Sequence, residues 1–163
     1  VRDPNEAIGW RQVGEDIDGE DAGDNSGYSV SLSDDGTIVA IGARYNDGVN
    51  GSNSGHVRVY KRDARTDSWR QVGTDIDGEA ANDLSGYSVS LSGDGKTVAI
   101  GAPLNDGNGS NSGHARVYEL DPDNEFEKII SNLRDADVTL TNKICEVDKE
   151  LNGVISKIIK TMK

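Results

Sequence analysis

The chain has 163 residues, of which 34 % are hydrophobic and 5 % aromatic, a composition that argues against one large core. The formal net charge of −12 argues against a nucleic-acid partner, which would need clustered Lys and Arg. The single Cys145 rules out an internal disulfide, and no apolar run approaches the roughly 18 residues of a membrane span. The composition therefore favours a protein built from several thin layers, each with a small core, over a protein with one large core.

Charge and glycine content both change near residue 123. Residues 1–123 hold 22 acidic and 10 basic side chains, whereas residues 124–163 hold 7 of each. Of the 20 glycines, 19 precede residue 124. This change predicts two domains, 1–123 and 124–163. Because the chain begins at Val1 rather than Met, we expect a processed chain or a piece of a longer one.

The first domain contains two copies of one unit, at residues 10–60 and 69–118. The copies align with one gap, at Val49, and 40 of the 50 aligned positions are identical. Such likeness indicates a recent duplication, so a prediction made for one copy also holds for the other.

Each copy predicts about four short strands, taken here in chain order for the first. YSVSLS at 28–33 alternates with period two, as a half-buried strand does. The DG dipeptide at 35–36 predicts a hairpin to the apolar run 38–43, which we expect to be buried on both faces. After a polar loop, HVRVY at 56–60 alternates again, and the WRQVG segment adds a strand that carries tryptophan. An all-β fold of two four-stranded blades, of the β-propeller type, is therefore predicted.

The stretch GYSVSLSGDGKTVAIGAP followed by GHARVY resembles the FG-GAP repeat of integrin-type β-propellers over residues 10–118. The family's Phe is replaced by Ser26 and Ser85, and its Gly-Ala-Pro becomes Gly-Ala-Arg at Arg44. The link that forms the calcium loop in integrin blades is too short here to wrap a cation. The resemblance therefore implies a fold and a general role in protein or glycan recognition, but not the family's metal site.

The sequence DIDGE, at 16–20 and 75–79, suggests a separate calcium site because calcium prefers alternating carboxylates beside a glycine. It lacks the third alternating ligand and the distal Glu of a complete calcium loop, so the alternative is an acidic turn from which Ile17 and Ile76 point into the core. With a fourth carboxylate four residues after the Glu of each copy, the candidate ligands for Ca²⁺ are Asp16, Asp18, Glu20, Asp24, Asp75, Asp77, Glu79 and Asp83.

Other residues repeat at matching positions in the two copies. Asn50 and Asn108 lie in N-glycosylation sequons, for which simple turn chemistry is the alternative. His56 and His114 are interpreted as structural residues at a strand edge. The residues Trp10, Arg11, Trp69 and Arg70 could stack on a sugar, although packing between blades is the preferred interpretation for both tryptophans. No motif of a catalytic site is present, so we expect no enzyme activity.

From Phe126 onward the apolar period becomes 3.5, which predicts a helical coiled coil over 124–163 with a helical hairpin breaking near Asp137 as the alternative. Its predicted oligomerisation residues are Ile130, Leu133, Leu140, Ile144, Val147, Leu151, Val154 and Ile158.

Two blades cannot close a ring, whereas three chains would supply six, so a homotrimer is favoured. Repeats upstream of Val1 in a longer parent are the alternative. We expect an extracellular or cell- or virion-surface module for adhesion or display, multivalent through its oligomeric tail and binding a glycan or a surface protein. The alternative function is a structural fibre or coat subunit that assembles by pairing blade edges and binds no small ligand.

Overall fold

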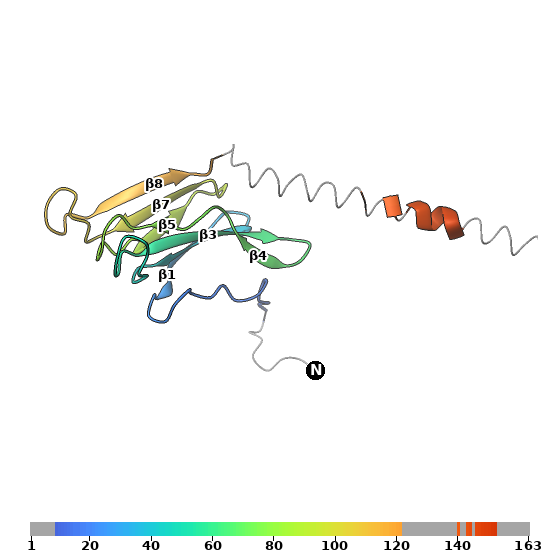
Figure 1. The fold of residues 1–163 in the computed structure, drawn as a ribbon. Coiled ribbons are helices and arrows are strands. Elements are labelled where there is room, and N and C mark those ends of the chain that lie inside the picture. The colour runs from blue at the N-terminus through green and yellow to red at the C-terminus, as the bar shows by residue number, and fades with distance from the viewer. Residues whose placement is uncertain (1–8, 122–139, 141–142, 145, 153–163) are drawn as a thin grey trace, which may run out of the picture. The chain divides into compact units, whose positions relative to one another are not determined.

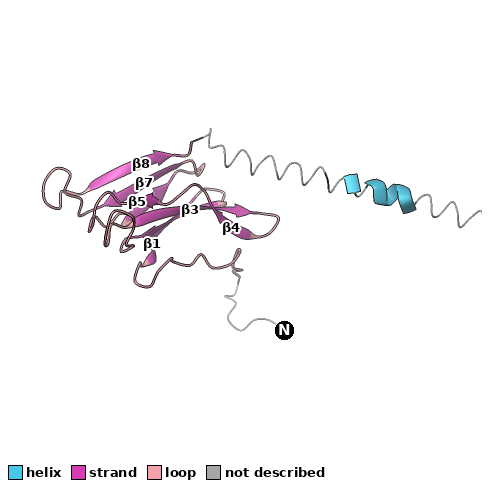
Figure 2. Cartoon of the chain, viewed as in Figure 1, coloured by secondary structure: helices cyan, strands magenta, loops and turns pink. Residues whose placement is uncertain are grey.

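The computed structural model describes residues 9–121, 140, 143–144 and 146–152. The chain divides into two compact units, Val1–Leu120 and Asp121–Lys163. All the described strands lie in the first unit, and the residues of the second unit that are described from 140 onward are helical (Figures 1 and 2).

The first unit contains two antiparallel sheets, one for each repeat. The first sheet has the order β1 (Ser26–Leu32), β2 (Ile38–Ala43), β3 (His56–Asp63) and β4 (Ser68–Gln71), and the short β5 (Ile76–Asp77) also pairs with β3. The second sheet has the order β6 (Ser88–Leu91), β7 (Thr97–Ala102) and β8 (His114–Glu119). The fold is therefore all-β and repetitive, as the sequence predicts.

The strand count of the two sheets differs because a repeat receives its last strand from the repeat that follows it. Strand β4 contains Trp69 of the second WRQV motif, yet it pairs with β3 of the first repeat. The sequence has no third WRQV motif after residue 118. Within the described residues, the expectation of four strands is met by β1–β4 of the first sheet and is wrong for the second sheet.

The hairpins predicted from the DG dipeptides are confirmed. In the first, Ser33 N–H donates to the Ile38 carbonyl at 2.9 Å, and Gly36 adopts a φ of 67°, which glycine reaches without strain. The Asp35 carboxylate accepts hydrogen bonds from the Ser33 hydroxyl and from the Thr37 N–H. These bonds hold the pKa of Asp35 down at about 2.

The core lies between the two sheets, which stack face to face. Ala40 and Val57 of the first sheet pack against Val98 and Ile100 of the second. The backbones approach closely at Gly42, where an added Cβ would lie 2.2 Å from the Gly86 carbonyl oxygen. A smaller cluster covers the opposite face of the first sheet: Val39, Ile41 and Tyr60, with Ile17 and Trp69 packed on it.

This stacking explains a difference between the two apolar runs. Residues 39–43 of β2 are all buried, which confirms the predicted burial on both faces. Along β7, buried residues alternate with partly exposed ones, so the same prediction fails for the second copy. The reason is that β2 has a covered face on each side, whereas among the described residues β7 is covered by the first sheet alone.

From residue 140 onward the described residues of the second unit are helical, and residues 146–152 form their longest continuous stretch. Four predicted oligomerisation residues fall within this part, and all are exposed in the single chain: Leu140, Ile144, Val147 and Leu151. The other four, Ile130, Leu133, Val154 and Ile158, lie outside the described residues. The coiled coil stays a prediction.

Candidate functional site

One end of the first sheet gathers the polar residues that repeat in the two copies. His56 is the first residue of β3 and pairs with Ala43, the last residue of β2, so both residues lie at the same end of the sheet. Segment 16–20 and Asp75 also reach this end of the sheet.

His56 lies between two carboxylates that are distant in sequence. Its Nδ1 atom is 3.8 Å from Glu20 Oε2 and 3.7 Å from Asp75 Oδ2, and the residue is only 1 % exposed. One ligand atom from each of the three residues lies within 4.8 Å of the others. Gln71 holds the Asp75 carboxylate by a 2.6 Å hydrogen bond from its Nε2. Glu20, His56 and Asp75 are called the His56 cluster below.

The His56 cluster can do one of two things chemically. A protonated imidazole can bridge the two carboxylates, or a neutral imidazole and the carboxylates can ligate a cation. One nitrogen and two carboxylates match the donors that Zn²⁺ accepts, whereas Ca²⁺ takes six to eight oxygens. Arg58 lies 3.7 Å from Glu20 and offsets part of the negative charge. The donor set therefore suits a transition ion better than calcium.

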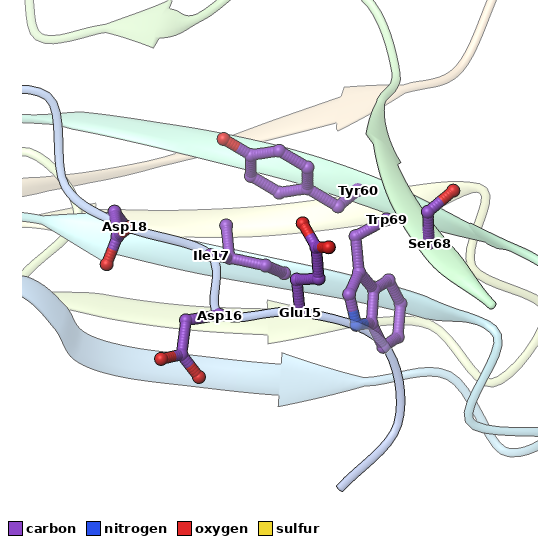
Figure 3. A pocket seen from close by; sticks show the side chains of 7 residues that line it. All are labelled: Glu15, Asp16, Ile17, Asp18, Tyr60, Ser68 and Trp69. Atoms are coloured by element: carbon purple, nitrogen blue, oxygen red, sulfur yellow. The ribbon is translucent and has the colours of Figure 1, made fainter.

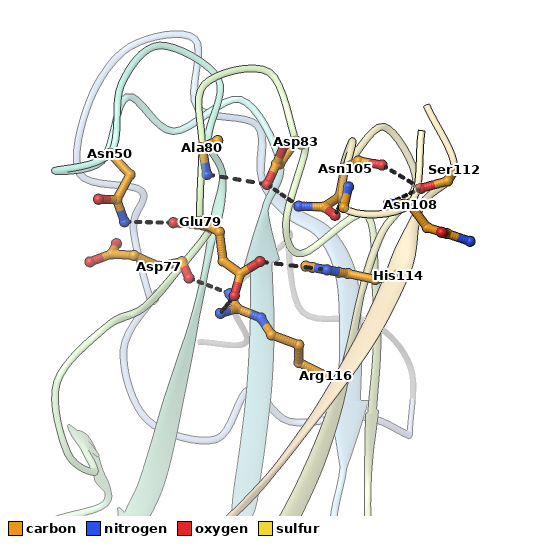
Figure 4. A network of polar contacts seen from close by, with 12 residues as sticks. Asn50, Asp77, Glu79, Ala80, Asp83, Asn105, Asn108, Ser112, His114 and Arg116 are labelled. Atoms are coloured by element: carbon orange, nitrogen blue, oxygen red, sulfur yellow. Dashed lines mark hydrogen bonds and ion pairs between the residues drawn. The ribbon is translucent and has the colours of Figure 1, made fainter. Parts of the chain in front are cut away.

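The second copy has two of the three members. His114 Nδ1 lies 3.7 Å from Glu79 Oε2, and Arg116 contacts the same carboxylate at 3.1 Å (Figure 4). Among the described residues, no second carboxylate joins them in a three-residue group. The reason is topological, because Asp75 follows the strand that the second repeat lends to the first.

The other predicted calcium ligands mostly hold the backbone in place. Asp16 accepts a hydrogen bond from Gln12, and the backbone carbonyls of Asp18 and Asp77 accept bonds from arginines. Asp24 and Asp83 are buried and fix the long loops through bonds from asparagine amides. Of the eight predicted ligands, only Glu20 and Asp75 meet in a candidate metal group within the described residues, and the sequence signal missed their histidine.

The two tryptophans occupy different surroundings. Trp69 packs beside Tyr60 and Ile17 and donates from Nε1 to the Val13 carbonyl at 2.9 Å. Figure 3 shows its ring at one side of a pocket of about 230 Å³, with Glu15 and Asp16 along the rim. Trp10 is 80 % exposed. Trp69 therefore packs on the face of the first sheet that points away from the second sheet, and in this structure neither tryptophan lies between the two sheets, as packing between blades would require.

The arginines beside the tryptophans and the two sequons lie at the surface or the edge of the sheets. Arg11 forms a 3.0 Å ion pair with Asp67, while Arg70 pairs with Lys61 in the β3–β4 ladder. Asn50 and Asn108 are both exposed. The Asn50 amide donates to the Gly78 carbonyl at 2.7 Å.

A cluster that the sequence did not suggest surrounds Arg44. Its guanidinium carbon lies 3.6 Å from the ring centroid of Tyr28, 4.4 Å from that of Tyr45 and 5.6 Å from that of Tyr87. The Tyr28 and Tyr87 rings contact each other with centroids 5.2 Å apart. All three tyrosines are partly exposed. These four residues are called the Arg44 cluster below.

Two residues of the Arg44 cluster, Arg44 and Tyr45, are replaced by other residue types in the second copy. The second copy has Pro103 and Leu104 where the first has Arg44 and Tyr45. The differences at these two positions are the sequence signal for the cluster. The cluster itself can be recognised only in the fold, which places Tyr28 and Tyr87, from different repeats, side by side.

Comparison with known proteins gives one match. A family model described as an FG-GAP repeat matches residues 17–60 and 74–118, once in each copy. No curated protein matches the chain.

Proposed function

Because the chain belongs to the FG-GAP repeat family, we propose that it is a binding module without catalytic activity, which acts outside the cell or at a cell or virion surface. In the part of the chain that the structure describes, no helix is long and apolar enough to cross a membrane. The Arg44 cluster is the observation that carries the proposal.

Tyrosine and arginine dominate the energetics of many recognition surfaces because they offer large, rigid contact areas with polar ends. In the Arg44 cluster, the guanidinium is stacked within cation–π distance of three rings, which fixes its orientation before a ligand arrives. Flat rings suit the apolar face of a sugar, and the guanidinium suits its acidic groups. A glycan or an acidic surface protein is therefore the expected ligand.

Several copies would strengthen a weak contact. The predicted tail, with apolar residues at coiled-coil spacing, would join chains, with a trimer favoured, and raise avidity without any new contact. The two exposed sequons would place sugars on a surface of the first unit if the protein is secreted through a glycosylating pathway.

A glycan array probed with the whole chain and with R44P/Y45L tests the proposal. This double substitution gives the first copy the residues of the second, which adopts the same hairpin and strands. We expect reproducible glycan signals for the unmodified chain and a loss of about tenfold or more for the variant. Signals that the variant retains would assign binding to another surface. Silence of both chains, with filaments visible by electron microscopy, would favour the alternative of a fibre or coat subunit.

The His56 cluster adds a proposed cation site to this module. Titration calorimetry with Zn²⁺ and with Ca²⁺ should show heat for Zn²⁺ that H56Q removes. H114Q, measured at a concentration where light scattering shows no association, is the matched control, since its histidine has one carboxylate partner in the single chain. Equal Zn²⁺ heats for the unmodified chain and H56Q would leave His56 as a structural imidazole between two carboxylates.

A further inference from the structure

We infer that a second copy of this chain docks head to tail on the second sheet, and thereby repeats the contact that joins the two repeats within one chain. The inference concerns two sheet faces and one strand edge. It depends neither on the helical tail nor on the ligand and cation sites proposed above.

The internal contact supplies the template, and it has two parts. One face of the first sheet, through Ala40 and Val57, packs on Val98 and Ile100 of the second sheet. At the edge, β4 from the second repeat pairs with β3 from the first. One repeat thus covers its neighbour and also completes its sheet.

Both halves of this contact are also present in open form. The face of the first sheet that points away from the second sheet is only partly covered by the smaller cluster, because Val30 and Leu32 on this face are 62 % and 58 % exposed. On the face of the second sheet that points away from the first, Val117 is 67 % exposed. The equivalent side chains of the other repeat all pack against the core between the sheets: Val89, Leu91 and Val59. The exposed valines and leucine are therefore the two sides of an interface that the chain already makes once.

Polar groups are matched in the same way. Inside the chain, the Ser29 hydroxyl donates to the Gly86 carbonyl at 2.7 Å, and the Ser31 hydroxyl accepts from Leu91 N–H at 2.9 Å. The equivalent serines of the second sheet, at 88 and 90, are exposed. Docking would place them against the backbone of residues 27 and 32 of the incoming copy.

The open edge adds charge complementarity. Strand β8 is the outer strand of its sheet in Figure 1, and residues 9–12, the counterpart of β4, form no strand in this structure. In the internal ladder Lys61 lies opposite Arg70. The same register between two copies would set Glu119 opposite Arg11. The internal pair is of like charge, whereas the pair between copies is of opposite charge, which favours it.

One local contact of the incoming segment already matches its counterpart in the second repeat. Gln12 Nε2 donates to Asp16 Oδ1 at 2.8 Å, just as Gln71 donates to Asp75 at 2.6 Å. In the docked copy, Asp16 would stand beside His114 as Asp75 stands beside His56. The second histidine cluster is incomplete without this partner residue.

A head-to-tail contact uses different faces on its two sides, so it propagates until a ring closes or a filament forms. Propellers close with about four to eight blades, which corresponds to about two to four copies of a two-repeat chain.

Cross-linking tests the inference on the whole chain. In a C145S background, R11C/E119C places cysteines at facing ladder positions, where the Cα separation of about 5.5 Å suits a disulfide. Mild oxidation should give covalent dimers or a series of larger oligomers, which disappear on reduction. The control R11C/S110C, with its second cysteine in the loop before β8, should not give that series. Equal yields from the two pairs would overturn the inference.

A second variant tests the faces. V117D places a charge in the proposed contact and should slow cross-linking of the R11C/E119C pair by about tenfold or more. V49D, which alters an exposed loop valine, is the matched control and should leave the rate unchanged. An unchanged rate in V117D would overturn the face contact. R44P/Y45L should cross-link normally, so failure of the proposed ligand site is distinguishable from failure of this inference.

Discussion

Replacing Gly42 by Ala should weaken the contact between the two repeats more than the same change in the other copy. The new Cβ would meet the Gly86 carbonyl oxygen at 2.2 Å and the Ser29 hydroxyl at 2.4 Å. Ordinary contact begins near 3.4 Å, so the sheets must separate by about 1 Å or the strands must bend. Overpacking of this kind costs about 3 kcal/mol, and displacement of Ser29 adds about 1 kcal/mol for its lost hydrogen bond.

The matched variant is Gly101→Ala. There the nearest atom is the Ser88 hydroxyl at 2.4 Å, with no backbone atom closer than 4.0 Å. A serine side chain can rotate away, so we expect a loss of about 1 kcal/mol or less. Urea unfolding followed by circular dichroism measures both values, at a concentration where light scattering shows no association. Equal midpoints for the two variants would refute the proposed close packing of the sheets at Gly42.

Two further predictions concern the two tryptophans and Asp35. Trp69→Phe should destabilise the chain by about 1 kcal/mol or more because the Val13 carbonyl loses the indole N–H that donates to it. Trp10→Phe should change stability by less than about 0.5 kcal/mol, and equal losses in urea unfolding would contradict this. The pKa of Asp35 is lowered to about 2 by hydrogen bonds from Ser33 and Thr37. A lowered folded-state pKa stabilises above the unfolded value of 3.8, and this contribution is lost as the pH falls toward 2. Acid unfolding of Asp35→Asn should therefore depend less steeply on pH between these values, and an unchanged profile would argue against the turn hydrogen bonds.

The repeat and its strands were predictable from sequence because they depend on local rules. Alternation at 28–33, the DG turn at 35–36 and the apolar run at 38–43 each specify a strand or a hairpin without reference to distant residues. The family followed from the same motifs, and the family model matches both copies. Identical local sequence gave nearly identical hairpins in the two repeats.

The candidate sites depended on the tertiary structure. Glu20, His56 and Asp75 are separated by 36 and 19 residues, and they meet only because the second repeat crosses back to finish the first sheet. Tyr28 and Tyr87 come from equivalent positions that a repeat pattern assigns to separate blades, yet stacking of the sheets brings their rings together.

Two nearly identical repeats thus acquire different environments. Local sequence determines hydrogen bonding along each strand, which both copies share. Burial of β2 on both faces, and of β7 on one, depends instead on which neighbour lies on each side. Local sequence therefore specifies the strands and hairpins of one repeat. Which side chains of different repeats meet is specified by the packing of one repeat on the next, because contacts between layers depend on position in the stack rather than on local pattern.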